Sequence, residues 1–293
     1  MQNNYQGFYF IANYHALTSY PTNLKEYSYD IAASYIALGL DPEKSTIFLQ
    51  SDVMEHLELY WYLSTVTPIG LLERAHSYKD KLANGLTSNH ALFSYPILQA
   101  ADILLYDADV VPVGKDQKQH IEYARDIAIK FNNQYGQTFK LPEPLISSKY
   151  STIKGTDGKK MSKSYNNTID IFADEKKLKK QINKIATDSK ELEEIKDPDN
   201  CMIFKFYELF GSKTQIDTLR DNYLKGNFGY GHAKKHLFEV AVEHFKEARL
   251  KRQELLENED YLDSVLKNGA VKARAACENK MKDIRERLGI FRT

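Results

Sequence analysis

The first part of the chain alternates short apolar runs with longer stretches that repeat at helical spacing. The apolar runs are GFYFIAN (7–13), STIFLQ (45–50) and VVPV (110–113). Their length and their aromatic and β-branched residues are typical of strands buried in a parallel sheet. A helical stretch follows each run. This order of strand, helix, strand, helix predicts an α/β fold with a doubly wound parallel sheet.

The helical stretches have their own boundary signals. Apolar residues recur at helical spacing from Leu24 to Leu38, and Gly39 follows where a left-handed C-cap would end a helix. A second helix runs through HLELYWYL and closes near Pro68, and an apolar helix is expected from about 92 to 105. After Gly114 the chain enters a helix whose core stripe is Ile121, Ala124, Ala128 and Phe131.

From Asp174 onward the pattern changes. The chain becomes rich in lysine and glutamate with a period of 3.6 residues, as in KKLKKQINKI, and strand signals disappear. We therefore expect two domains, an α/β domain over 1–172 and an all-helical C-terminal domain over 173–293.

Composition narrows the class of protein. The chain has 293 residues, 42% hydrophobic and 27% charged, with a formal net charge of zero, so a globular fold is expected and binding of nucleic acid through overall charge is not. Cys201 and Cys277 are far apart without a CxxC, which argues against a zinc site or a disulfide framework. No run resembles a membrane span or a signal peptide, which predicts a soluble, cytoplasmic protein.

The stretch GKKMSKSYNN (158–167) is the first candidate for chemistry. It is entered through Gly155 and Gly158 and holds Lys160, Met161, Ser162, Lys163 and Ser164. Lysine is a movable point charge, so two lysines in a flexible loop suit the binding of phosphates. An ordinary solvated basic turn would look the same.

A second candidate is VPVGKDQKQH (111–120), at the end of a predicted strand, where α/β sheets bind their ligands. Gly114 allows close approach of a ligand to the backbone. Asp116 can accept a hydrogen bond from a ribose hydroxyl, and Gln117 can bind an amine. A plain helix N-terminus with an acidic first turn is the alternative.

The helix YPILQAADILLY (95–106) carries polar residues on one face. Tyr95, Gln99 and Asp102 are spaced i, i+4 and i+7. Asp102 lies in an apolar run, so its carboxylate needs a hydrogen-bond donor, either a protein group or a ligand N–H. His15 follows the first strand, where a histidine is more often a packed or capping residue than a catalytic one.

These motifs together resemble one family. The chain closely resembles the tryptophanyl-tRNA synthetases, which are class I enzymes with a Rossmann-type catalytic domain. Two segments carry the resemblance: YPILQAADILLYDADVVPVGKDQKQHIEYARDIAIKFN and DGKKMSKSYNNT. The similarity extends from NYHALT to GNFGYGHAKKHLFE and so covers nearly the whole chain. KMSKS marks class I synthetases in general, whereas AAD-ILLY with VPVG-x-DQ points to tryptophan rather than tyrosine.

The resemblance implies an activity. Such an enzyme uses ATP, with Mg²⁺, to activate L-tryptophan as tryptophanyl-adenylate and then transfers the amino acid to tRNA(Trp). It also implies a homodimer and a helical domain on the anticodon side.

The resemblance further assigns roles to residues. For tryptophan, Asp102 would accept a hydrogen bond from the indole N–H, and Tyr95 and Gln117 would hold the α-amino group. Val111 and Val113 would line the ring pocket, with His15 near it. Gln99 would lie against the indole, where the family usually has a methionine. For ATP, Gly114 and Asp116 would lie on the ribose side. Lys160 and Lys163 would be catalytic at the pyrophosphate, with Met161, Ser162 and Ser164 completing the loop.

The front of the sequence departs from the family. The family opens with a strand, a glycine-containing turn and a helix with a HIGH-type signature, and nothing before NNYQGFYF supplies them. In this fold the first strand is central. We therefore expect a sheet without its first strand and little adenylate formation by this chain alone. The alternative is a non-catalytic tryptophan- or tRNA-binding protein derived from the synthetase.

Overall fold

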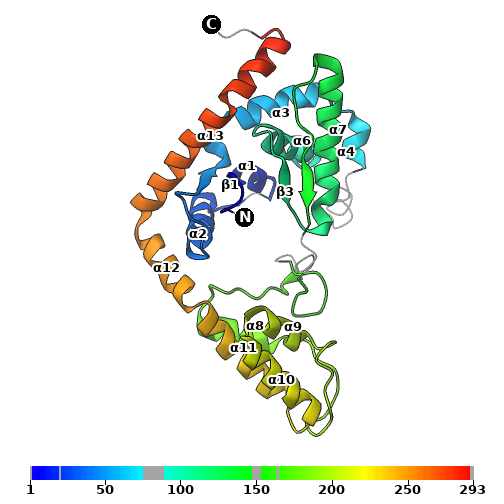
Figure 1. Ribbon diagram of the computed structural model, residues 1–293, viewed down its shortest axis with the longest axis vertical. Coiled ribbons are helices and arrows are strands. Elements are labelled where there is room, and N and C mark those ends of the chain that lie inside the picture. Colours follow the sequence, from blue (N-terminus) through cyan, green and yellow to red (C-terminus); the bar gives the residue numbers. More distant parts are fainter. Residues whose placement is uncertain (1, 20, 75–88, 147–152, 163–164, 291–293) are drawn as a thin grey trace. The chain divides into compact units, whose positions relative to one another are not determined.

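The computed structural model describes residues 2–19, 21–74, 89–146, 153–162 and 165–290, without the side chains of Ser19 and Asp116 (Figure 1). The chain divides into two compact units, Met1–Ser151 with Glu254–Thr293, and Thr152–Gln253. This division differs from the expected boundary at 172/173. The last helix of the chain belongs to the first unit, because it packs on the sheet.

The strands of the first unit pair in parallel, as predicted. β1 (Gly7–Ile11) pairs with β2 (Ser45–Leu49), and β3 (Val110–Pro112) pairs with β4 (Glu143–Leu145). In the described residues the two pairs form separate two-stranded sheets. A groove of about 280 Å³ between them is lined by residues 5–10 and by 102, 103 and 106–112. The groove thus lies between β1 and β3.

Helices cover these strands. Their bounds are α1 Asn13–Ala16, α2 Leu24–Ala37, α3 Glu55–Val66, α4 Ile69–Glu73, α6 His90–Leu104, α7 Lys118–Tyr135 and α13 Glu259–Arg287. The predicted core stripe of α7 is fully buried, and Gly39 has the left-handed φ of +99° expected of the C-cap. The main core joins α3, α6 and α7 with the C-terminal half of α13.

The face that α2 buries is not the one with its largest apolar residues. Ser28, Ala32, Ala33 and Ile36 are buried, whereas the large residues of the predicted stripe are exposed by 38–55%: Tyr27, Ile31, Tyr35 and Leu38. Small side chains let α2 lie close to β1 and α13. Helical spacing therefore predicted the helix, but the burial of its large side chains does not follow from it.

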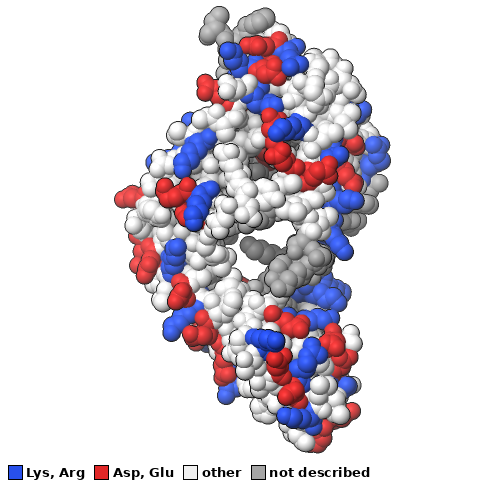
Figure 2. Space-filling view, in the orientation of Figure 1, with Lys and Arg blue, Asp and Glu red and all other residues white. Residues whose placement is uncertain are grey.

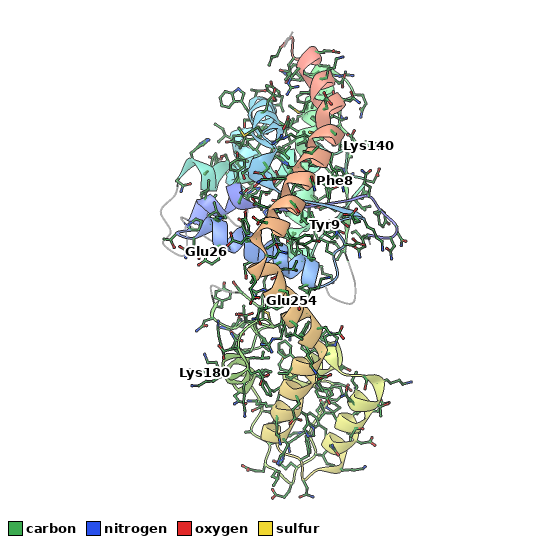
Figure 3. All side chains as sticks on the ribbon, turned by 90° about the vertical axis from the view of Figure 1, so that its left-hand side faces the viewer. Phe8, Tyr9, Glu26, Lys140, Lys180 and Glu254 are labelled. Carbon is green, nitrogen blue, oxygen red and sulfur yellow. The ribbon has the colours of Figure 1, made fainter. Side chains whose placement is uncertain are left out.

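Helix α13 lies directly against β2. At Gly269 an added Cβ would come within 1.8 Å of the Ile47 carbonyl oxygen, so only glycine allows this approach. Further along α13, Arg285 forms two hydrogen bonds with Glu58 of α3, at 2.7 and 2.6 Å. Figure 3 looks onto α13, with Phe8 and Tyr9 of β1 behind it. These contacts explain why the C-terminal helix belongs to the α/β unit.

The second unit is helical, as predicted for this part of the chain. It contains α8 Glu175–Asn183, α9 Met202–Phe210, α10 Lys213–Lys225, α11 Tyr230–His244 and most of α12 Lys246–Glu257. Its core includes Leu178, Phe204, Tyr223 and Leu237. Buried Lys196 donates to three carbonyls of the preceding loop, at 2.7 to 3.3 Å.

Surface charge, helix hydropathy and the two cysteines each bear on expectations from the sequence. Basic and acidic side chains are interspersed over the visible face (Figure 2), in keeping with the net charge of zero. Within the described parts of the chain, each helix is too short or too polar to cross a bilayer. Cys201 and Cys277 are buried free thiols.

Candidate active site

The carboxyl ends of β1 and β2 are joined by side chains. Just past β1, the Asn13 side chain donates to Ser51 Oγ at 2.7 Å and accepts from the Ser51 N–H at 3.0 Å. Just past β2, Gln50 Oε1 accepts from the Tyr14 N–H at 3.1 Å. Because parallel strands end at one edge of the sheet, these bonds fix the two strand ends side by side.

Asp102 of α6 reaches this edge and is surrounded by protein donors. Its side chain is 1% exposed. Oδ1 accepts from Gln50 Nε2 at 2.8 Å and lies 2.7 Å from His56 Nδ1, and Oδ2 lies 2.9 Å from His15 Nε2. Burial alone raises the pKa of Asp102, but the hydrogen bonds from His15 and His56 outweigh it and lower the pKa below its usual range. The carboxylate is therefore ionised and held by three side chains.

Asp102 lies in the wall of a cavity of about 440 Å³, which we call the Asp102 cavity. The lining residues are Phe10, Ala12, His15, Thr18, Tyr95, Gln99, Asp102, Gln117 and His120. The predicted residues His15, Tyr95, Gln99, Asp102 and Gln117 are thus brought together from three parts of the chain: α1, α6 and the turn before α7. An apolar wall with convergent polar groups is typical of a small-molecule site.

Tyr95 provides a further polar group in this wall. Its hydroxyl lies 3.1 Å from His120 Nε2. Burial, followed by the influence of Tyr123, raises the pKa of Tyr95 to about 12. The phenol is therefore protonated at neutral pH and remains a hydrogen-bond donor.

The residues after β3 are less closely gathered. Val111 lines the groove between β1 and β3, and Val113 packs against the main core; neither is among the described residues that line the Asp102 cavity. Gly114 precedes a single 3₁₀ turn, η3 (Lys115–Gln117), with ordinary φ of −70°. Asp116 lies within this turn, and its side chain is outside the described residues.

The 158–167 loop belongs to the second unit and has its own framework. Lys154 and Lys160 form an antiparallel bridge, and Gly158 has the left-handed φ of +79° that its turn requires. Met161 packs against the helical core of this unit. Lys163 and Ser164 lie outside the described residues. The turn predicted from the glycines is thus a short hairpin.

Asn167 holds this hairpin, a role that sequence reasoning missed. Its side chain is buried, accepts from the Ser162 N–H at 2.8 Å and donates to Asp157 Oδ1 and the Lys160 carbonyl, at 2.8 and 3.0 Å. Gly155 lies so close that an added Cβ would meet Asn167 Cγ at 2.3 Å. Asn167 ends the quoted motif, but only the folded hairpin shows its partners.

The relatives of the chain agree with this fold. A model of the tRNA synthetases class I (W and Y) matches residues 1–246. The tryptophan–tRNA ligase of Fusobacterium nucleatum is 58% identical over 293 residues, which is 99% of this chain and 90% of the relative. That of Campylobacter jejuni (strain RM1221) is 55% identical over 99% of this chain and 91% of its own length.

Solved structures of relatives also match this fold. The Campylobacter jejuni tryptophanyl-tRNA synthetase complexed with ADP and tryptophan has a TM-score of 0.92 at 55% identity, covering 98% of this chain and 91% of that one. The Mycoplasma pneumoniae enzyme has a TM-score of 0.84 at 27% identity, covering 99% and 90%.

The parallel strands, the cavity at their carboxyl edge and these matches define the class: the chain belongs to the class I aminoacyl-tRNA synthetases, in the family of the tryptophan and tyrosine enzymes. The level of identity to the ligases of Fusobacterium and Campylobacter narrows this further. Within the family, the chain belongs with the tryptophan–tRNA ligases.

Proposed function

We propose that this chain binds L-tryptophan in the Asp102 cavity, with the indole N–H donating to Asp102 Oδ2. The supporting observation is the hydrogen-bond capacity of the carboxylate. Oδ1 has two side-chain donors, whereas among the described residues Oδ2 has one, His15, which lines the cavity together with Asp102. A carboxylate oxygen has two acceptor positions, so Oδ2 can accept one more hydrogen bond.

The remaining roles follow from the same placement. Tyr95 and Gln117 would bind the α-amino group, and Gln99 would lie against the indole ring, with His15 beside it. Val111 and Val113 do not line the Asp102 cavity in the described residues. Their predicted contact with the ring therefore requires that the ligand reach toward β3. For ATP, Gly114 and Asp116 would bind the ribose side. That the chain binds a nucleotide and tryptophan together is supported by its similarity to the Campylobacter jejuni enzyme complexed with ADP and tryptophan.

In the proposed reaction the tryptophan carboxylate attacks the α-phosphorus of ATP and pyrophosphate leaves. The aminoacyl group then passes to the 3′ end of tRNA(Trp). Lys160 and Lys163 are proposed to stabilise the charge of the leaving pyrophosphate, with Met161, Ser162 and Ser164 shaping the loop. The protein contributes positioning and charge stabilisation rather than covalent chemistry.

Several finer expectations rest on the family. We propose a cytoplasmic homodimer that meets the anticodon side of its tRNA through the helices of the second unit. Among the described residues, no cluster of three His, Cys, Asp or Glu side chains could hold a metal ion. Mg²⁺ is proposed to act at the phosphate oxygens of ATP.

Calorimetry with L-tryptophan tests this proposal. Wild-type chain should bind tryptophan saturably, and Asp102→Asn should weaken binding by about tenfold or more, because it replaces a charged acceptor. Asp126→Asn is the matched control, since Asp126 is exposed on α7 and lies outside the lining of both the Asp102 cavity and the groove. Absence of saturable tryptophan binding by the wild-type chain would overturn the proposed site.

Catalysis is tested separately by tryptophan-dependent exchange of pyrophosphate into ATP. Exchange that requires Lys160 and Lys163 supports the roles proposed for the loop. Exchange that is unchanged when both are replaced by alanine would contradict those roles, although tryptophan binding would stand.

A further inference from the structure

Two fully buried residues hold Asp102 from the side away from the cavity. Gln50 and His56 are both 0% exposed, and both bind Oδ1. Neither belongs to the described lining of the Asp102 cavity. They cannot touch a ligand there, yet they occupy both acceptor positions of Oδ1, so they determine which oxygen of Asp102 faces the cavity.

Tyr106 extends this arrangement by one step. Its hydroxyl lies 2.9 Å from His56 Nε2. Burial raises the pKa of Tyr106, so its hydroxyl keeps its proton at neutral pH. If Tyr106 donates to Nε2, the neutral His56 ring carries its proton on Nδ1 and donates it to Asp102 Oδ1. One hydrogen-bond chain therefore selects the histidine tautomer that a carboxylate needs.

Aromatic rings pack around these hydrogen-bonded side chains and keep the His56 imidazole in place. Phe8 stacks on Tyr106 with ring centroids 4.5 Å apart, and the rings of Phe10 and Phe48 lie 5.7 and 6.1 Å from that of His56. In such apolar surroundings an unmade hydrogen bond is costly, which restricts the network to one arrangement.

We propose that Gln50, His56 and Tyr106 are positioning residues that determine specificity for an indole N–H by fixing Asp102 with Oδ2 toward the cavity. This inference rests on the proposed tryptophan site. A carboxylate fixed in this way rejects a ligand that lacks the N–H, because a buried acceptor is then left without its partner. A carboxylate free to turn toward other donors would discriminate less.

The experiment compares two ligands. L-Tryptophan and β-(3-benzothienyl)-L-alanine have the same shape, but sulfur replaces the indole N–H in the second. The ratio of their dissociation constants, measured by calorimetry, reports the N–H contact alone. We expect wild-type chain to prefer tryptophan by about tenfold or more.

Three variants test the roles of the positioning residues Tyr106 and His56. Tyr106→Phe removes one hydroxyl and should lower the preference by about threefold or more, as should His56→Leu, which removes the donor to Asp102. His56→Asn should recover most of the preference, because its amide N–H can take the place of Nδ1–H. Tyr62→Phe is the matched control: Tyr62 belongs to the main core against which Tyr106 packs, but its hydroxyl donates to Glu58.

A spectroscopic measurement keeps the test decisive if His56→Leu fails to fold. The ¹⁵N shifts of His56 should show a proton on Nδ1 in the wild-type chain, and Tyr106→Phe should change the tautomer populations. Folded Tyr106→Phe with unchanged ligand preference and unchanged His56 shifts would overturn the inference. Wild-type chain that binds tryptophan without preferring the N–H would also overturn it, whereas failure to bind tryptophan at all would overturn the proposed site itself.

Discussion

Replacing Asn167 with alanine tests how the hairpin of the KMSKS loop is held. The change removes three hydrogen bonds made by one buried side chain, to the Ser162 N–H, the Lys160 carbonyl and Asp157 Oδ1. The backbone bond from the Thr156 N–H to the Asn167 carbonyl, 2.8 Å long, survives the substitution. The loss is therefore confined to the amide group.

The size of the effect follows from the number of bonds. Each protein hydrogen bond contributes about 1 kcal/mol net, so the hairpin should lose about 3 kcal/mol of local stability. Since about 1.4 kcal/mol is a factor of ten, the opening equilibrium of the hairpin should rise by roughly a hundredfold. The helical core of the second unit does not depend on this amide and should keep its stability.

Hydrogen exchange measures this opening at single residues. The Ser162 amide should lose about a hundredfold of its protection in Asn167→Ala, since it loses its acceptor. The Ala173 amide, which donates to the Asp170 carbonyl at 3.2 Å in the same unit, should be unaffected. Ser162 protection that stays within about threefold of wild type would refute the reasoning.

Asn167→Asp separates the donor from the acceptor role of this side chain. It keeps the acceptor for the Ser162 N–H but places a second carboxylate beside Asp157. In the wild-type chain the Asn167 amide, by its hydrogen bond, lowers the pKa of Asp157. In the variant, the second carboxylate replaces the amide donor and raises the pKa of the pair, so lowering the pH should neutralise one carboxylate and partly restore protection. Protection that only falls as the pH is lowered would contradict this account.

Two further substitutions test the first unit. Gly269→Ala should lower the free energy of unfolding in urea by about 1–3 kcal/mol, because the new Cβ meets the Ile47 carbonyl; Gly70→Ala, with only a flexible side chain nearby, should be neutral or stabilising. The hydrogen bond to Asp263, with burial, raises the pKa of Tyr29 to about 12, so this pair stabilises the fold below about pH 10 and the contribution is lost as the pH rises toward 12. Phenolate absorbance of Tyr29 should therefore appear near pH 12, and Asp263→Asn should move it toward its ordinary value; an unchanged titration would contradict the assignment.

Local pattern was sufficient to predict the elements that build the site. The strands at 7–11, 45–49 and 110–112 and the longer helices between them were predicted because period and composition act over a few residues. The short helices α1 and α4 were not predicted. The strand at 143–145 was missed, since three residues that include Pro144 have no recognisable period. The helical C-terminal region was predicted, but periodicity does not say which core a helix joins. That depends on the contact of Gly269 with Ile47, more than 200 positions apart.

For the candidate site, too, local spacing was predictable and the contacts between distant residues were not. The i, i+4, i+7 spacing correctly placed Tyr95, Gln99 and Asp102 on one face of α6, and the need of Asp102 for a donor was correctly inferred from its apolar neighbours. The identity of the donors was not predictable. His15, Gln50 and His56 are 87, 52 and 46 positions away from Asp102, and only the tertiary fold brings them together.

The register of β1 against β2 links the fold to the specificity of the site. Ile11 pairs with Leu49, so Gln50 leaves the end of β2 where its amide can reach both the Tyr14 N–H and Asp102. Successive side chains of a strand point to opposite faces, so a shift of one residue would turn Gln50 away from Asp102. The carboxylate would then lose a donor at Oδ1 and the orientation of Oδ2 with it. In the proposed site, selection for an indole N–H would therefore depend on strand pairing as well as on the residues that touch the ligand.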